Sequence, residues 1–436
     1  VHENRMQLAW FAGTMSIGLP YDLNYFSKCR EVHDSVKNVL GHDPTQSKFS
    51  STQAHILSEI QEMHEKESWE IVSLYFDDNQ GIVLSTFSRG EEPQCRLIPY
   101  SRTELDAMQF LFDTMLEEND ATLVSAGDIK STEVEKKKQW WKSRYNLDAK
   151  MTEFLSQLDS IIDTPNSGLL AQSFKRISLA NACPVILIID ENLQCFPWES
   201  TKYFEEKPVT RMPSINSVIA NWRRRKKLHF SMSNTSHVVN PEQNLPTTEK
   251  NFLNMVADLK TQNLPVSFKD GLVGVKPTTT QIIELLKPAD VFVYWGHDSF
   301  LKFSSTAKIA KESFECVVFD MGCNSGRLFS QGIFGSEGKV LSLLSGGSPA
   351  IVANLWKVST GDCDVFSERL VQFCSKAAGS RDGAMLGDAI AYAKARDPQN
   401  STKKCREMES NKNKCIKLAA LNGAATVVYG LPVLMK

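Results

Sequence analysis

The second half of the chain alternates between segments typical of strands and segments typical of helices. Apolar runs such as Val291–Trp295 and Val317–Met321 are separated by stretches of helical periodicity. This alternation is typical of a mostly parallel sheet with helices on its faces. In the first half, the continuous aliphatic run Val185–Ile189 predicts another strand, buried on both faces. An α/β fold is therefore expected.

The part of the chain before residue 183 has a different pattern. It is expected to be mostly helical up to about residue 65, with a hairpin of Ser68–Leu74 and Ile82–Phe87 and helical periodicity over 104–118 and 133–162. In the second half, the predicted helices are 247–259, 278–286, 338–344 and 364–374, and the predicted strands are 238–239, 291–295, 317–321, 350–356 and 427–433.

A polar stretch, 223–235, separates the two patterns. At 436 residues, the chain is long enough for about two or three domains. We take this stretch as the boundary between a domain of residues 1–230 and a domain of residues 231–436. It opens with the basic pentamer Arg223–Lys227, which fits either a localisation or partner signal or the solvated end of a helix.

Composition excludes several classes of protein. Lys plus Arg is 49 and Asp plus Glu is 51, which argues against broad electrostatic binding to nucleic acid or anionic membrane. No apolar run approaches the roughly 18 residues that span a bilayer, and the stretch Leu8–Leu19 lacks the basic flank of a signal peptide. The first residue is Val1, so we expect a piece of a longer protein.

The ten cysteines point to a reducing compartment. They are scattered without a CxxC pair, so spacing predicts neither a zinc site nor a thioredoxin-type motif. We expect reduced thiols and a cytosolic or nuclear protein. No metal or cofactor is predicted.

Two predicted strands end in the same way, with a glycine followed by a reactive side chain. One runs into Gly296 and His297, and the other runs into Gly322 and Cys323. Each glycine is expected to let the backbone turn sharply and present the next residue. Ligands of open α/β sheets bind at the carboxyl ends of strands, so His297 and Cys323 are expected at the same edge.

A histidine beside a cysteine is the minimum for nucleophilic catalysis by sulfur. The imidazole holds the thiol proton and later protonates a leaving amine, while backbone N–H groups after the glycines serve as an oxyanion hole. The alternative interpretation is a buried structural cysteine near an unrelated histidine. Gly-His-Asp also occurs at 41–43, where no strand precedes it.

The segment after the predicted strand 350–356 is a candidate specificity site. Asp362 or Asp364 would pair with the guanidinium of an arginine, and Trp356 would stack on it. Equally, Asp362 fits a helix N-cap and Asp364 a first-turn residue favoured by the helix dipole. The sequence leaves both interpretations open.

An ordered series of motifs resembles the C-terminal protease region of the separase family, over roughly residues 100–436. These motifs are Trp140-Trp141 with Arg144, Leu147-Asp148 and Met151; Pro184–Asp190 with Leu193-Gln194 and Pro197–Ser200; Val209–Arg211 with Pro213-Ser214; Asn240-Pro241 with Asn244-Leu245 and Thr247–Glu249; Asn354–Trp356; and Gly423–Ala425 with Tyr429–Pro432.

The resemblance implies a caspase-like cysteine endopeptidase, with a mostly parallel sheet flanked by helices. A helical and non-catalytic caspase-like domain that interacts with substrate would precede the active one. The catalytic pair would be His297 and Cys323, with the backbone of Asp298 and Cys323 as oxyanion hole and Asp364 as the acid that recognises arginine.

The resemblance also implies partners and a location. The substrate would be the kleisin subunit of cohesin, cut after arginine to separate sister chromatids in mitosis. The inhibitor would be a securin, and a helical region would precede the chain. The protein would occupy cytoplasm and nucleus, with chromosomes, spindle and centrosome.

The sequence departs from the family pattern in three ways. Asp298 replaces the usual glycine after the histidine, Lys357 and Thr360 alter its LWDVTD segment, and Asn324 replaces a serine. A carboxylate at position 298 would pair with His297 or raise the pKa of Cys323. The alternative is therefore a diverged, weak or silent relative that binds kleisin or securin-like segments without cleaving them.

Overall fold

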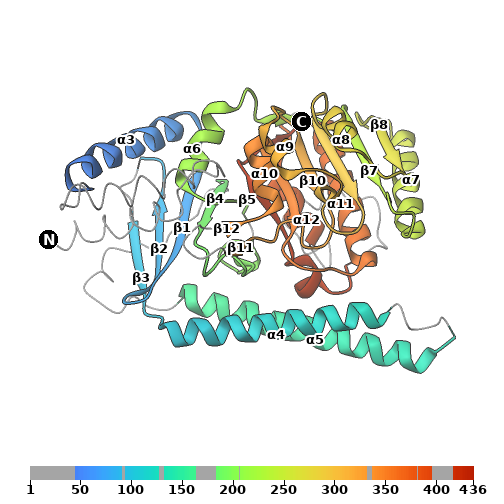
Figure 1. Ribbon diagram of the computed structural model, residues 1–436, viewed down its shortest axis with the longest axis horizontal. Coiled ribbons are helices and arrows are strands. Elements are labelled where there is room, and N and C mark those ends of the chain that lie inside the picture. Colours follow the sequence, from blue (N-terminus) through green and yellow to red (C-terminus); the bar gives the residue numbers. More distant parts are fainter. Residues whose placement is uncertain are drawn as a thin grey trace.

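The structure is a computed structural model that describes residues 45–90, 94–126, 132–163, 183–205, 207–330, 336–380, 382–394 and 416–436. One 11-stranded sheet runs through it in the order β3-β2-β1-β4-β5-β15-β13-β10-β9-β7-β8 (Figure 1). The strands are β1 (Glu70–Asp77), β2 (Gly81–Phe87), β3 (Gln94–Ile98), β4 (Val185–Ile189), β5 (Val209–Met212), β7 (Thr235–Val239), β8 (Phe268–Val273), β9 (Val291–Trp295), β10 (Val317–Asp320), β13 (Ala350–Asn354) and β15 (Thr426–Gly430).

Short strands and helices complete the described part of the chain. β11 (Phe329–Ser330) pairs with β12 (Ser336–Glu337), and β16 (Leu434–Met435) lies between β14 (Ala384–Met385) and β6 (His229–Phe230). The helices are α3 (Thr45–Lys66), α4 (Arg102–Ala126), α5 (Val134–Asp163), α6 (Ile215–Arg224), α7 (Pro246–Thr261), α8 (Thr279–Leu286), α9 (Thr306–Lys311), α10 (Lys339–Gly346), α11 (Thr360–Ala378) and α12 (Leu386–Lys394), with short turns η1 (Trp198–Ser200), η2 (Phe300–Phe303) and η5 (Ala419–Gly423).

Alternating side chains of the second-half strands bury themselves on both faces of the sheet. In β9, Phe292 and Tyr294 pack in the core beneath α8, α9 and α10, whereas Val293 and Trp295 pack in the core beneath α7, α11 and α12. The predicted mostly parallel sheet flanked by helices is confirmed. The predicted hairpin is also confirmed as β1 and β2, which pair antiparallel.

The long helices α4 and α5 lie side by side along one edge of the sheet (Figure 1). Arg102, at the start of α4, forms an ion pair with Asp78 in the turn after β1. Further along α4, the Asn119 amide donates a hydrogen bond of 2.9 Å to the carbonyl of Lys357, just beyond β13. The helical hairpin therefore covers the edge at which β1 and β13 end.

The basic pentamer lies at the end of α6 and is tied to its surroundings. Arg223 pairs with Glu59, Arg225 with Glu67, and Lys227 with Asp290. This favours the interpretation as a helix end. The boundary near residue 230 stays a prediction, although β15 brings the last part of the chain between β5 and β13 of the same sheet.

The last predicted strand ends earlier than expected, and the start of the chain lies outside the described residues. The final strand stops at Gly430, not Val433, and pairs antiparallel with β13. Residues 1–44, with the stretch Leu8–Leu19, lie outside the described residues. In the ranges that are described, no helix is long and apolar enough to span a membrane, and no three His, Cys, Asp or Glu side chains form a metal-binding group.

Candidate active site

The neighbouring strands β9 and β10 bring His297 and Cys323 to one pocket. The strands pair in parallel, with Tyr294 opposite Asp320, so the loops that follow them leave the same edge of the sheet. Both side chains line a pocket of about 30 Å³. His297 is exposed and Cys323 is half-buried, which leaves the pair accessible from solvent.

Gly296 and Gly322 were expected to allow sharp turns of the backbone. In the structure they instead allow close packing of neighbouring atoms. Neither glycine has a positive φ; the left-handed residues are Asp298 (φ 50°) and Asn324 (φ 55°), two positions after each glycine. A Cβ on Gly322 would lie 1.5 Å from the Asp298 carbonyl oxygen. Asp and Asn tolerate this conformation better than most residues, so the two loops bend alike without glycine at the bend.

The buried carboxyl group of Asp320 links the loop of His297 to the loop of Cys323. Burial raises its pKa to about 7, against the effect of hydrogen bonds from the Ser299 hydroxyl and the backbone N–H groups of Phe300 and Gly322. Ser299 and Phe300 belong to the histidine loop and Gly322 to the cysteine loop. Asp320 therefore contacts both loops through one side chain.

The cysteine loop is also held by β13. The Asn354 side chain donates a hydrogen bond of 3.2 Å to the Gly322 carbonyl. The Asn354 backbone N–H donates to the Ser325 hydroxyl (3.0 Å), which itself donates to the Asp320 carbonyl (2.7 Å). These bonds fix the backbone on both sides of Cys323.

The environment of Cys323 disfavours the thiolate form of its side chain. Burial raises its pKa, and the Asp298 carboxylate adds to the increase. The thiol donates to the Val358 carbonyl at 3.7 Å, which favours its protonated form. A backbone hydrogen bond at Val358 and the charge of Lys357 act in the opposite direction and lower its pKa. A base at His297 would therefore have to remove the proton before the sulfur attacks a carbonyl.

Asp364 forms another wall of the same pocket. It lies near the start of α11 and accepts hydrogen bonds from the Thr248 hydroxyl (3.1 Å) and the Asn251 amide (3.0 Å), both on α7. Asp364 is almost wholly buried, with 6% of its surface exposed. A carboxylate held this way is suited to a cationic side chain entering past His297 and Cys323.

Two residues predicted for substrate binding are placed elsewhere. The Asp362 carboxylate accepts hydrogen bonds from the backbone N–H groups of Lys417 and Leu418 and from the Asn422 amide, so it anchors the segment around η5. Trp356 is buried against Phe112, and its Nε1 donates to the Leu421 carbonyl. Neither residue lines the pocket of Cys323.

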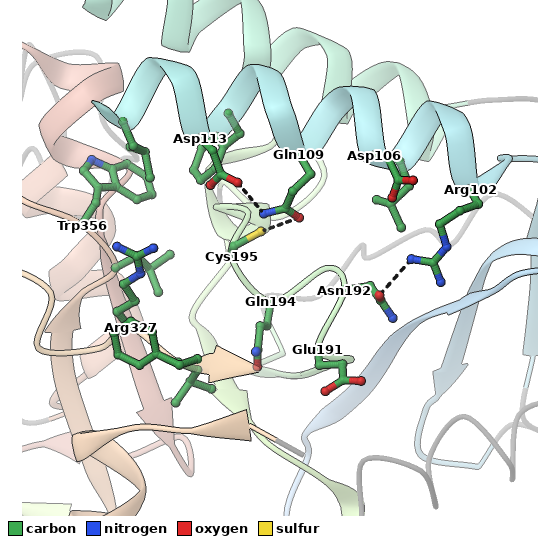
Figure 2. Close-up of a pocket in the computed structure, with 16 residues that line it drawn as sticks. Arg102, Asp106, Gln109, Asp113, Glu191, Asn192, Gln194, Cys195, Arg327 and Trp356 are labelled. Atoms are coloured by element: carbon green, nitrogen blue, oxygen red, sulfur yellow. Dashed lines mark hydrogen bonds between the residues drawn. The ribbon is translucent and has the colours of Figure 1, made fainter. Parts of the chain in front are cut away.

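Trp356 instead forms one end of a larger pocket of about 450 Å³ beneath α4 (Figure 2). Figure 2 shows Asp106 and Asp113 on the helix, with Glu191 and Arg327 on the loops opposite. Arg327 is four residues after Cys323, so this pocket adjoins the loop of the predicted nucleophile.

Comparison with known proteins shows which family the chain resembles. Residues 171–363 match the family described as the separin protease domain. A separin of Emericella nidulans is 30% identical over 253 residues, which are 57% of this chain and 11% of that protein. A separin of Mus musculus is 29% identical over 256 residues, which are 57% of this chain and 11% of that protein. These matches show that this region of the chain is similar to the separin protease domain.

A solved structure shares the fold of this chain. The separase–securin complex of Saccharomyces cerevisiae superposes with a TM-score of 0.69 and 18% identity, covering 88% of this chain and 31% of that chain. The chain spans about a ninth of the length of the two curated separins. This likeness concerns the fold of the matched region.

Several separin motifs form structural contacts away from the pocket. Arg144 on α5 is buried and donates to Asn119 and Thr122 of α4. Asp148, one turn later, accepts the backbone N–H of Leu421. Arg211 on β5 pairs with Glu199 in η1. The motifs beyond the pocket therefore stabilise the hairpin and the loops that surround the site.

Sequence reasoning assigned no role to three residues that contact the candidate site or the segments beside it. Asp320 had a visible signal, because it is a charged residue in the otherwise apolar run Val317–Met321. Asn251 carried none, since an amide on a helix surface is common. Asn119 lies more than two hundred residues from Lys357, whose carbonyl it binds, and no spacing rule predicts that contact.

Proposed function

We propose that this separin-like chain is a cysteine endopeptidase that cleaves the kleisin subunit of cohesin after an arginine. The observation that supports the proposal is the single pocket shared by His297, Cys323 and Asp364. A nucleophile, a base and a buried acid are the groups needed to cut a peptide after a cationic residue.

In the proposed mechanism, Asp364 binds the substrate guanidinium and sets the arginine carbonyl beside Cys323. His297 accepts the thiol proton as the sulfur attacks the carbonyl carbon, and the backbone N–H groups of Asp298 and Cys323 donate to the oxyanion. His297 then protonates the leaving amine, and water hydrolyses the thioester. His297 must act as base because burial raises the pKa of the Cys323 thiol.

Covalent labelling tests this proposal in one step. A peptide that carries arginine next to a thiol-directed warhead is incubated with the protein, and the adduct is mapped by mass spectrometry. We expect one adduct on Cys323 that is lost in His297→Ala, and no cleavage of kleisin by Cys323→Ser. Cys374→Ser is the matched control, since Cys374 is buried on α11. Cleavage that survives in Cys323→Ser would refute the mechanism.

The alternative is a weak or silent relative that binds kleisin or securin-like segments without cleaving them. The observation that favours it is the Asp298 carboxylate, which raises the pKa of Cys323. On this alternative, an arginine peptide binds without turnover, and Asp298→Gly produces a large gain in activity. Turnover by the wild type that depends on Cys323 and that Asp298→Gly does not increase would exclude it.

Further proposals concern partners and location. The yeast separase of matching fold is seen in complex with securin, and we propose a securin-type inhibitor for this chain too. We also propose a preceding helical region of the same protein and a location in cytoplasm and nucleus, including chromosomes, spindle and centrosome. Co-purification with a tagged chain and fluorescence microscopy through mitosis test these proposals.

A further inference from the structure

A second thiol, that of Cys363, lines the pocket of the predicted nucleophile. The pocket of about 30 Å³ has both Cys323 and Cys363 on its walls. That space is comparable with two or three spheres of water size. The mechanism proposed above uses only one of these sulfurs, so Cys363 has no role in it.

Two hydrogen bonds connect the segment that carries Cys323 with the segment that carries Cys363. Cys323 donates to the Val358 carbonyl, five residues before Cys363, at 3.7 Å. Cys363 donates to the Met321 carbonyl, two residues before Cys323, at 3.2 Å. Each sulfur thus contacts the chain segment that carries the other cysteine.

The two thiols also act on each other electrostatically. Burial raises the pKa of Cys363, and a charge on Cys323 raises it further. Coulombic effects weaken with distance and with screening by solvent, so this one is in keeping with two thiols that line one pocket. It agrees with the two hydrogen bonds, which place each sulfur beside the other cysteine's segment.

We propose that Cys363 is a resolving thiol that protects Cys323 against oxidation by forming a reversible disulfide with it. This inference rests on the proposed function only in taking Cys323 as the reactive thiol. The oxidant belongs to the peroxides, and the reductant is a dithiol. The modification makes cleavage by the chain dependent on redox conditions.

The disulfide forms in two steps. The Cys323 thiolate attacks one oxygen of hydrogen peroxide; an S–O bond forms, the O–O bond breaks, and hydroxide leaves, so sulfur is oxidised to sulfenic acid. Cys363 then attacks that sulfur; an S–S bond forms, the S–O bond breaks, and the hydroxyl leaves with the thiol proton as water. A dithiol restores both thiols and becomes a cyclic disulfide.

Other described cysteines provide internal controls. Cys374 lies eleven positions after Cys363 on α11, or about 16 Å along a helix. Cys316 is fully buried just before the first residue of β10, at the opposite end of that strand from Cys323. Neither residue lines the pocket, so a disulfide between either one and Cys363 is not expected.

Peptide mapping tests the disulfide without any measurement of proteolysis. The full chain is treated with hydrogen peroxide, its free thiols are blocked with N-ethylmaleimide, and it is digested with trypsin without reductant. We expect the peptide 312–327 to be joined to 358–369, and fragmentation to place the bond on Cys323 instead of Cys316. The joined pair should be lost in Cys363→Ala and Cys363→Ser and kept in Cys374→Ala.

A second readout follows recovery from oxidation. After peroxide, dithiothreitol should restore most of the wild-type reactivity of Cys323 toward a thiol probe. Each variant is compared with its own untreated sample. The recovered fraction should be about fivefold lower in Cys363→Ser, because an unprotected sulfenic acid proceeds to sulfinic acid, which a dithiol does not reduce.

The outcomes separate this inference from the proposed function. Sulfinic acid on Cys323 of the wild type, with no joined peptide, would overturn the resolving role even if the chain cleaves kleisin. A joined peptide in a chain that cleaves nothing would support the disulfide and refute the endopeptidase. Equal recovery in wild type and Cys363→Ser would also overturn the inference.

Discussion

Gly322 packs directly against the carbonyl oxygen of Asp298, where a Cβ atom would lie 1.5 Å from it. This contact joins the loop of Cys323 to the loop of His297. Because backbone cannot move aside as a flexible side chain can, the separation between the two loops depends on the absence of a side chain at position 322.

Gly322→Ala is therefore expected to separate the loops and to lower stability by at least about 2 kcal/mol, with loss of Cys323 labelling by the arginine probe. Urea unfolding and labelling measure the two effects. Gly361→Ala is the matched control, because nothing lies within 4 Å of a Cβ there and its φ is not positive. Wild-type labelling in Gly322→Ala would show that the contact is not required.

Asp298→Asn is expected to lower the pKa of the Cys323 thiol. The substitution removes a carboxylate that disfavours the thiolate, and asparagine tolerates the same left-handed backbone. The pH dependence of alkylation of Cys323 by iodoacetamide, followed by mass spectrometry, should shift to lower pH. Asp258→Asn, on the exposed side of α7, should leave the profile unchanged. An unshifted profile in Asp298→Asn would remove the electrostatic basis for the weak-relative alternative.

Asp320 is expected to make stability depend on pH. Its pKa is raised by burial from the ordinary 3.8 to about 7, so its contribution is fully present below about pH 4 and is lost as pH rises through about 7. The loss is on the order of 4 kcal/mol between those limits. Asp320→Asn cannot ionise, so its stability relative to wild type should rise from about pH 4 to pH 8 in urea unfolding. A difference that stays constant with pH would contradict this assignment.

The neighbouring acids Asp362 and Asp364 are expected to behave differently when neutralised. Asp364→Asn should reduce kcat/KM for an arginine substrate by at least about tenfold. It should lower the melting temperature less than Asp362→Asn does. Asp362→Asn weakens bonds to two backbone N–H groups and an amide and should destabilise the fold by roughly 1–3 kcal/mol. Peptide kinetics and thermal unfolding of both variants check this division. Equal losses of specificity in the two variants would contradict it.

The sequence predicts the sheet edge better than the individual contacts. Apolar runs separated by stretches of helical periodicity locate β9, β10 and β13. Parallel pairing of these strands then brings His297 and Cys323 together. The two acids cannot be assigned that way, because Asp362 and Asp364 lie two positions apart on one helix and differ only in which distant segment they meet. The role of Gly322 depends on the backbone of another loop, which no local pattern contains.

The helical hairpin makes the site sensitive to events far from it. Asn119 binds the Lys357 carbonyl, Asp120 pairs with the Lys357 side chain, and the adjacent Val358 carbonyl accepts the Cys323 thiol. On α4, Phe110 is 74% exposed. A protein that bound this exposed surface and tilted α4 would shift the Val358 carbonyl that binds the Cys323 thiol, because Lys357 and Val358 are adjacent in the chain. Binding there would act on Cys323 allosterically and leave the pocket open to substrate.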